Sequence, residues 1–556
     1  MTIRTGYPRD GIHDVCVVGS GPAGLAAAIH CAELGLSVVV VEAGGMLPQD
    51  GASLPPYGEV VDPARHAPLD VAVCRALGGN SWWWGGCCMP LDPIDFAPRD
   101  FVADSGWPID EEDIAPYYEK TAAFLDCGHL VFSSPAVAFQ ALDDSGDVTF
   151  SRLERWARTR AAPKRHGAFL RDAAAITVCL GTTAIAIEQE DGHARIRVRD
   201  AGGEAAVNAR FHVLAGGGLG STKLLLEYRR RHPPAFGGGE GALGHYYMGH
   251  VHGSIADIVF DRPELAESAD FFLDDATWVR RRLAITPQAQ IAHEILNTSF
   301  WVDNPPFHDH RHRSGILSAV FLALSFPAIG RLLVSEGIRR VHIGTNRNYA
   351  AHLANVILNP FSTVAAAWQI LRQRYIDKPR RPGFLIRNKA GRYALTFHAE
   401  QMPQRASTVL LADDAADGAL RIDLRFCPAD AVSIVRAYDL VDRSLRGAGI
   451  GRLEYHVPAE EREAAVLGQL TDGYHQEGLM RMGDAPATSV VDGNCKVHGF
   501  SNLYVASTGV MTTSSQANPT FTACALAIRL AHHLAEPGAR ETGARDSSGV
   551  AAPTSV

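Results

Sequence analysis

Residues 14–30, DVCVVGSGPAGLAAAIH, carry the clearest information about the fold class. It begins with an apolar run, passes through a glycine-rich turn and continues into alanine-rich sequence typical of a helix. Gly19 permits the turn, Gly21 lets the backbone approach a pyrophosphate, and Gly24 allows close packing of helix on strand. Unpaired N–H groups at the helix N-terminus favour phosphate binding. The pattern predicts the first β-α unit of a dinucleotide-binding domain.

A second apolar run strengthens that prediction. Residues 37–41 are SVVVV, typical of a strand buried on both faces, and Glu42 follows them directly. An acidic residue about twenty positions after the glycines accepts hydrogen bonds from a ribose diol and disfavours a 2′-phosphate. A glycine loop that only begins a helix is the alternative, but the two strands and the acid favour the nucleotide site.

Later segments also combine glycines with apolar runs. Residues 76–86, ALGGNSWWWGG, place three tryptophans between glycines, and residues 211–221, FHVLAGGGLGS, predict a strand, a turn and a helix start. Near the C-terminus, NLYVAS (502–507) and ANPTFT (517–522) precede a helix expected over 523–534. The turn at 216–220 lacks the spacing of a second complete fingerprint, which disfavours a pyridine-nucleotide-dependent enzyme.

In this order and at these spacings, the segments resemble those of the glucose-methanol-choline (GMC) oxidoreductases, nearest in style to pyranose- and sugar-oxidising members. The segments LGHYYMGH (243–250), EQMP (400–403) and YHQEGLMRMG (474–483) add to the resemblance. It implies FAD in an α/β doubly wound (Rossmann-like) domain and an α+β substrate domain with an antiparallel sheet. It also implies oxidation of an alcohol by hydride transfer to flavin N5.

The resemblance implies His475 as the catalytic base and Asn518 as the second group at the substrate hydroxyl. Histidine suits the first role because its pKa lies near working pH. Asn518 and Pro519 also fit the N-cap and N1 positions of the final helix, whose positive end would face the flavin. We interpret His250 and His498 as structural.

Cofactor contacts follow from the fingerprint and the resemblance together. Trp83 stands where some relatives carry a histidine bonded to flavin, so we expect non-covalent FAD. The ten cysteines show no metal-ligand spacing, and we expect no metal site. The residues expected at FAD are Gly19, Gly21, Gly24, Glu42, Gly79, Asn80, Ser81, Trp84, Gly85, Ala215, Gly216, Ser507, Asn518, Pro519 and Thr520.

We expect a discontinuous domain organisation. Residues 1–125, 161–250 and 471–536 would form the FAD-binding domain, and 126–160 with 251–470 the substrate-binding domain. Residues 537–556 have the composition of a disordered tail. The substrate sheet is expected to contain strands at 384–387, 393–397, 408–411 and 420–424, followed by a helix after Pro428.

An apolar insertion spans residues 314–371. Its segments 314–330 and 349–371 approach the lower length of a membrane span, but prolines and asparagines interrupt both. We favour a helical hairpin packed on the substrate domain. Contact with a membrane, with an electron-acceptor subunit or with an apolar substrate is the alternative.

Composition narrows the class of protein. The chain has 556 residues, 46% hydrophobic and 20% charged, with a net charge of −9. No basic stripe is present, which argues against a nucleic-acid partner. The first twelve residues lack the apolar core of a signal peptide and a twin-arginine pair, so we predict a cytoplasmic enzyme.

Three functional hypotheses follow. The first is an FAD-dependent alcohol oxidoreductase acting on a sugar, glycoside or polyol-like hydroxyl, with oxygen or another electron acceptor. The second keeps the chemistry but takes an apolar alcohol, such as a sterol or long-chain alcohol. The third is a redox-silent FAD lyase. The sequence leaves oxidase and dehydrogenase both open.

Overall fold

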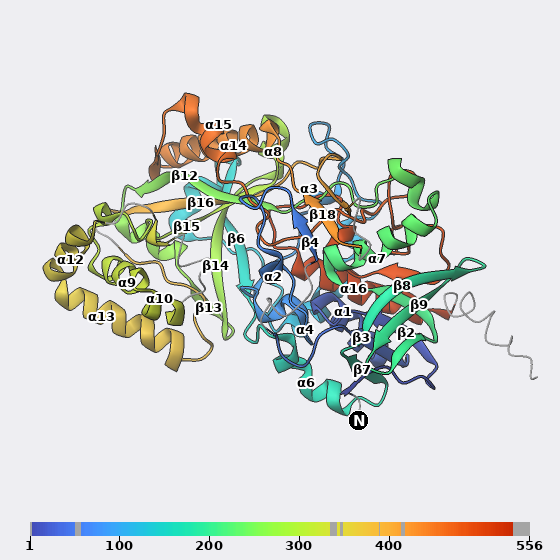
Figure 1. Ribbon diagram of the computed structural model, residues 1–556. Helices are drawn as coiled ribbons and strands as arrows, with labels where there is room; N and C mark the ends of the chain where they lie inside the picture. Colours follow the sequence, from blue (N-terminus) through green and yellow to red (C-terminus); the bar gives the residue numbers. More distant parts are fainter. Residues whose placement is uncertain are drawn as a thin grey trace, which may run out of the picture.

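The computed structural model describes residues 3–49, 57–333, 342–344, 348–387, 390–412 and 418–537 (Figure 1). The tail expected over 537–556 lies outside the described residues except for Pro537. The structure contains a parallel sheet, a large antiparallel sheet and a helical lobe. Figure 1 shows the lobe at one end of the molecule and the parallel sheet toward the other.

The predicted dinucleotide-binding domain is built on a six-stranded sheet. Its order is β1-β7-β3-β2-β11-β20, and every pair in it is parallel. The central strands are apolar runs because both of their faces are covered. The strands are β1 (Ile3–Thr5), β2 (His13–Val18), β3 (Val38–Glu42), β7 (Ile176–Leu180), β11 (Ala209–Leu214) and β20 (Leu503–Val505).

Three helices position the ends of these strands. Helix α1 (Pro22–Glu33) begins at Pro22, because proline suits the first helical turn, and it packs against α16 (Thr520–Ala535). Helix α7 (Gly217–Arg231) starts directly after the turn that follows β11. The α/β doubly wound arrangement predicted from the sequence is therefore confirmed.

Two small sheets accompany the parallel one. Strands β8 (Thr183–Glu190), β9 (His193–Asp200) and β10 (Gly203–Ala206) form an antiparallel meander between β7 and β11. Strands β17 (Thr408–Leu411), β18 (Leu420–Asp423) and β4 (Gly58–Val60) form another sheet. The assignment of 408–411 and 420–424 to the substrate sheet was therefore wrong, because β18 pairs with β4 instead.

The second large sheet is antiparallel, as predicted. Its order is β19-β12-β16-β15-β14-β6-β5, and β13 pairs with β14. Its strands are β5 (Cys87–Cys88), β6 (Val148–Trp156), β12 (His250–Phe260), β13 (Phe272–Asp274), β14 (Thr277–Ile285), β15 (Thr298–Asp303), β16 (Arg392–Glu400) and β19 (Gly451–Tyr455).

One predicted strand of that sheet does not form. Residues 384–387 carry no regular secondary structure. The backbone N–H groups of Leu385 and Ile386 donate to the side chains of Asp270 and Asn304 rather than to a neighbouring strand. Side-chain acceptors have therefore replaced the ladder hydrogen bonds that a strand would need.

The two faces of the antiparallel sheet differ in polarity because successive side chains alternate. Leu283, Phe300 and Phe397 lie in an apolar core covered by α14 (Pro428–Gly447), whose Tyr438 contacts both phenylalanines. The opposite face carries charged and imidazole side chains and contacts C-terminal segments of the nucleotide-binding part. This polar face is where the candidate site forms.

Shorter helices complete the described structure. The α-helices are α2 (Leu69–Ala72), α3 (Pro93–Phe96), α4 (Tyr118–Leu125), α5 (Gln140–Asp143), α6 (Ala162–Asp172), α8 (Pro287–His293) and α15 (Arg462–Leu467). Short 3₁₀ turns include η2 (Gly79–Trp82) in the tryptophan loop and η11 (Thr508–Val510) before α16.

The apolar insertion folds into helices. They are α9 (Gly315–Ser325), α10 (Pro327–Leu333), α12 (Tyr349–Leu358) and α13 (Pro360–Leu371). Pro327 begins α10 and Pro360 begins α13, so each proline divides an apolar run into two helices. Among the described residues, no helix is both long enough and apolar enough to cross a bilayer.

Candidate active site

The turn after β2 has the geometry that its glycines predicted. Gly19 adopts φ +104°, and a Cβ there would lie 2.5 Å from the carbonyl oxygen of Ala215. A Cβ at Gly24 would lie 2.2 Å from the carbonyl oxygen of Gly19, so helix and strand are in close contact. A Cβ at Gly21, in contrast, would meet no protein atom within 4 Å. The space beside Gly21 is therefore open.

Glu42 closes β3 beside this turn. Its Oε2 accepts hydrogen bonds from the Ser20 backbone N–H and hydroxyl, at 3.0 and 2.6 Å, and its Oε1 accepts from the Gly44 N–H. Burial raises the pKa of the Glu42 carboxyl, and the hydrogen bonds act against that shift. Glu42 thus holds the glycine turn in place, and its contact with a ribose stays a prediction.

The tryptophan loop lies against the same turn. A Cβ at Gly79 would be 2.9 Å from Gly21 Cα, so the two backbones approach closely. Asn80 spans the loop, accepting from the Cys74 N–H and donating to the Ala72 carbonyl. Ser81 Oγ donates to the Gly78 carbonyl and accepts from the Ala162 N–H. These polar side chains position the loop through contacts with protein.

The rest of this loop was predicted to face the cofactor. Trp84 Nε1 donates to the Arg160 carbonyl, and a Cβ at Gly85 would contact the ring of Trp156. Trp83 is 45% exposed. Trp84 thereby anchors the loop to residues before α6.

Three further predicted cofactor residues lie at the ends of parallel strands. Ala215 donates from its N–H to the Val18 carbonyl, and Gly216 caps α7 while its N–H donates to Ser221 Oγ. Ser507 follows β20 and accepts at Oγ from the Gly509 N–H, so it caps η11. These residues therefore gather at the carboxyl ends of the parallel strands, where ligands bind in open α/β sheets.

One prediction about the final helix was wrong. Helix α16 begins at Thr520 with Pro519 as its N-cap residue, and no side chain caps it. Asn518 is not the cap because its Oδ1 accepts a hydrogen bond from Arg282 Nη2 at 3.2 Å. This hydrogen bond places the Asn518 side chain against the antiparallel sheet, on the substrate side of the predicted site.

His475 lies among other histidines. Its ring centroid is 4.6 Å from that of His250 and 6.3 Å from that of His398, in both cases edge-on. Its Nδ1 is buried without a hydrogen-bond partner in the part of the chain that the structure describes. Burial, helped by nearby His250 and His252, lowers the pKa of His475 well below 6.5. The imidazole is therefore neutral at pH 7 and able to accept a proton.

A buried carboxyl–imidazole pair, Glu477 and His250, lies beside His475. His250 Nδ1 lies 3.1 Å from Glu477 Oε1, and both side chains are fully buried. Burial lowers the pKa of His250 to about 3, and burial with the nearby Glu400 raises the pKa of Glu477 well above 4.5. The His250 imidazole is thus neutral at pH 7. Sequence reasoning treated His250 as structural and missed Glu477, although Glu477 is two residues from His475.

The three histidine rings bring ligand atoms within 4.8 Å of one another. The rings of His250 and His398 are stacked, 4.5 Å apart and 11° from parallel. Lone pairs in the planes of two parallel rings do not converge on one point, which disfavours a shared metal ion. His398 Nδ1 also hydrogen-bonds the Gln516 carbonyl at 2.8 Å. The expectation of no metal site stays a prediction.

A charged network on the antiparallel sheet holds Asn518. Arg282 donates to Asn518 Oδ1, to the Gln516 carbonyl and to Gln516 Oε1. Glu154 is fully buried and accepts from Arg282 Nε and Arg280 Nε at 2.6 and 2.5 Å. The two arginines keep the pKa of Glu154 below its usual value in spite of burial.

Sequence reasoning missed this network. Arg280 and Arg282 alternate along β14, which places both on one face of the sheet beside Glu154 of β6. The signal was available in the run TWVRRRLAI, where charges interrupt an otherwise apolar strand. Their side chains also lie over the ring of Trp301, at 4.9 and 5.3 Å.

Comparison with known proteins matches two segments of the chain to known families. Residues 403–527 match the family described as GMC oxidoreductase, and residues 13–225 match the family described as pyridine nucleotide-disulphide oxidoreductase. The resemblance to GMC oxidoreductases found in the sequence is thus shown for the C-terminal segment 403–527. The C-terminal match includes His475 and Asn518, and the N-terminal match includes the glycine turn.

Two relatives give the match more detail. Paromamine 6'-oxidase of Streptomyces fradiae is 25% identical, over 95% of this chain and 92% of its own length. C-glycoside 3-oxidase of Microbacterium trichothecenolyticum is 31% identical over 26% of this chain. That alignment spans only 33% of the C-glycoside 3-oxidase.

Solved structures support the fold. Pyridoxine 4-oxidase from Mesorbium loti aligns with a TM-score of 0.51 and 17% identity, over 94% of this chain and 98% of its own. A fungal aryl-alcohol oxidase aligns with a TM-score of 0.53 and 14% identity, over 95% and 99%. At these identities the likeness concerns the architecture of the two sheets alone.

The two family matches imply FAD, and the residues present fit it. The first turn of α1 has no side-chain cap, so its N–H groups are available to a phosphate. The open space beside Gly21 lies at the same turn, where a Cβ would fill a cradle for the pyrophosphate. When bound, FAD supplies the acceptor for a hydride.

Proposed function

We propose that this chain is an FAD-dependent oxidoreductase that oxidises a hydroxyl of a sugar, glycoside or polyol-like substrate to a carbonyl. His475 is the base, and Asn518 is the second group at the reacting oxygen. The names of the relatives support this substrate class, because one acts on paromamine and another on a C-glycoside.

Each residue has a distinct task in this proposal. His475 is neutral at pH 7 and takes the proton of the substrate hydroxyl, while the hydride leaves the carbon that bears this hydroxyl. Arg282 donates to Asn518 Oδ1, so the Nδ2 donor of the same amide points away from Arg282. That donor is the group we assign to the substrate oxygen. His250 is neutral at pH 7 and therefore places no second positive charge beside His475.

The observation that carries the proposal is the Arg282–Asn518 hydrogen bond within a buried charged network. Because Arg282 already pairs with Glu154 and Gln516, the network holds Asn518 in one orientation before a substrate binds. His475 Nδ1, in contrast, is buried without a partner among the described residues, which costs about 1–3 kcal/mol until a hydroxyl supplies one. The names of the relatives then favour a sugar-like substrate over a sterol or long-chain alcohol.

Several finer features belong to the same proposal. FAD is bound non-covalently, since Trp83 stands where some GMC members attach flavin through histidine. The FAD-binding contacts are those expected from the sequence, with Glu42 acting at the ribose. The chain divides into the FAD-binding and substrate-binding parts given above, and it is cytoplasmic.

Anaerobic titration tests the proposal. The holoenzyme is mixed without oxygen with sugars, glycosides, polyols, sterols and long-chain alcohols while the oxidised-flavin absorbance is followed. Bleaching by the polyhydroxylated compounds alone is the expected result. Bleaching by sterols or long-chain alcohols alone would overturn the substrate class, and a flavin that no alcohol reduces would favour the redox-silent lyase.

Two further measurements complete this test. Readmission of air separates an oxidase, which recovers its oxidised spectrum at once, from a dehydrogenase that needs another acceptor. Acid precipitation then tests the flavin attachment, since non-covalent FAD stays in the supernatant and a covalent flavin stays with the protein.

A further inference from the structure

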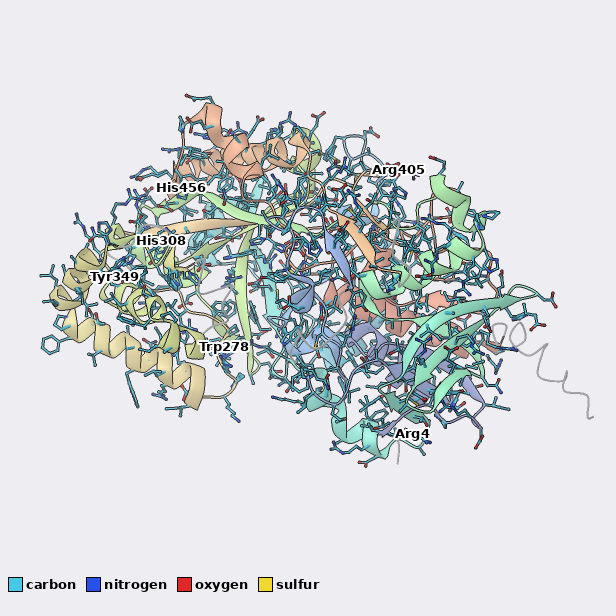
Figure 2. All side chains as sticks on the ribbon, viewed as in Figure 1. Arg4, Trp278, His308, Tyr349, Arg405 and His456 are labelled. Atoms are coloured by element: carbon cyan, nitrogen blue, oxygen red, sulfur yellow. The ribbon has the colours of Figure 1, made fainter. Side chains whose placement is uncertain are left out.

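The helical lobe exposes several large apolar side chains on α12 and α13. Phe361 is 89% exposed, more than any other phenylalanine among the exposed large hydrophobic residues described. Figure 2 shows Tyr349, the first residue of α12, toward the outer end of the lobe. We call these six residues the lobe face: Ile357, Leu358, Phe361, Val364, Trp368 and Leu371.

The lobe face has no partner among the residues that the structure describes. On α13, Phe361, Val364, Trp368 and Leu371 follow one another at intervals of three and four residues, which places them on one side. The other side of α13 packs on α9, where a Cβ at Gly315 would meet the side chain of Thr363. An amphipathic helix normally buries its apolar side, yet α13 buries the side that carries a threonine.

Helix α12 is arranged in the same way. His352 on its inner side is buried and stacks on Phe321 of α9, with ring centroids 4.0 Å apart. Leu353, Ile357 and Leu358 are 50%, 72% and 78% exposed. The lobe therefore has a small core of its own, and its outward face is apolar. Exposed apolar patches of this kind mark contact with a partner or a membrane.

Charge indicates the kind of partner. Residues 326–381 contain nine arginines and lysines against two acidic residues, a formal charge of +7, while the whole chain carries −9. Among the described side chains, Arg372, Lys378 and Arg380 are exposed just after α13. An apolar helix face bordered by cations, with tryptophan among its members, is the pattern of helices that lie in the surface of an anionic bilayer.

We propose that the lobe face docks this enzyme on an anionic lipid surface. The helices lie in the plane of the bilayer, with Phe361 and Trp368 in the acyl boundary and the basic residues at the headgroups. Helices of ten and twelve residues are about 15–18 Å long, so they suit a surface position.

A second copy of the chain fits this face less well. Two copies joined through it would bring two strongly cationic segments together, and like charges across an interface oppose association. An anionic bilayer buries the apolar side chains and also provides negative charges for the cations. The proposal is independent of the substrate, because the lobe face contributes no residue to the candidate active site.

Vesicle sedimentation tests the proposal. The holoenzyme is mixed with vesicles of phosphatidylcholine and phosphatidylglycerol, or of phosphatidylcholine alone, at low and high salt. We expect binding to the anionic vesicles that is weaker at high salt, with about a fivefold gain for each basic residue at the surface. The double variant Phe361→Ser/Trp368→Ser should weaken binding about tenfold or more.

A matched control variant and light scattering distinguish lipid binding from non-specific adhesion and from dimer formation. Val137→Ser removes an apolar side chain that is 91% exposed but lies outside the lobe, and it should leave vesicle binding unchanged. Equal binding of the parent and the double variant, or equal binding to both vesicle types, would overturn the proposal. So would a dimer in light scattering that the double variant converts to a monomer without any vesicle binding.

Discussion

The candidate active site and the helical lobe depart from the usual distribution of residues in opposite ways. At the site, polar atoms such as His475 Nδ1 and Glu477 Oε2 are buried without a hydrogen-bond partner among the described residues. In the lobe, Phe361 and Trp368 are 89% and 61% exposed. Burial of unpaired polar atoms and exposure of large apolar groups both cost free energy unless a partner compensates. Each region therefore identifies a contact that the folded chain alone does not satisfy.

The two regions differ in how that contact is specified. In the proposed mechanism the site depends on single atoms, since one hydrogen bond from Arg282 determines which end of the Asn518 amide would face the substrate. The lobe depends on area and charge, and no single side chain fixes an orientation. Substitutions at the site should therefore change activity steeply, whereas those in the lobe should change it little.

The largest effect is expected from Gly21→Val. A Cβ at this position meets no protein atom within 4 Å, so the fold tolerates it, but the side chain fills the space assigned to the pyrophosphate. The purified variant should have lost its FAD, measured as the ratio of flavin to protein absorbance. Gly447→Val is the control, because Gly447 is equally open and lies at the end of α14. A Gly21→Val protein with a full complement of FAD would show that the cofactor lies elsewhere.

The second-largest effect is expected from removal of the proposed base. His475→Ala should retain FAD and slow the anaerobic reduction of flavin by substrate roughly 10²-fold or more, the scale of general base catalysis. Stopped-flow absorbance gives the rate constant. His129→Ala is the matched control, since His129 is an exposed histidine paired with Asp275. Equal rate constants for parent and His475→Ala would exclude His475 from the reaction.

Asn518→Asp should have a smaller effect. The carboxylate still accepts from Arg282, but the Nδ2 donor to the substrate oxygen is lost. We expect flavin reduction to slow by about 10- to 10²-fold, with little change in thermal stability. Asn359→Asp, in the lobe, serves as a control for the same chemical change. If Asn518→Asp lowers stability as strongly as activity, the amide has a structural role.

The depressed pKa of His475 determines the pH dependence. The active form is neutral, and its pKa lies well below 6.5, so flavin reduction should stay constant from neutral to mildly acid pH and fall only below 6.5. Stability should change in the same direction. Below 6.5 the unfolded chain takes up protons that the folded His250, His398 and His475 do not, and stability declines. A rate constant that halves near pH 6.5 would contradict a neutral, buried base.

The parts predicted from sequence and the parts missed have different physical origins. The glycine turn, β2, β3 and α14 were predictable because their patterns are local. Strand β18 was placed in the wrong sheet because its partner β4 is far away in sequence. Arg282 was missed because its role depends on β6, β14 and the segment before α16 meeting in space. The N-cap prediction for Asn518 failed because this long-range hydrogen bond took precedence over local capping.

The smallest effect is expected in the lobe, on stability. Phe361→Ser should change the free energy of unfolding by only about 0.5 kcal/mol, because the side chain is 89% exposed. Phe321→Ala, in the small core beneath it, should cost about 3–5 kcal/mol, since Phe321 is fully buried against His352. Thermal denaturation in the absence of lipid compares the two. A large loss for Phe361→Ser would mean that the face already has a partner within the protein, and the contrast between lobe and site would then disappear.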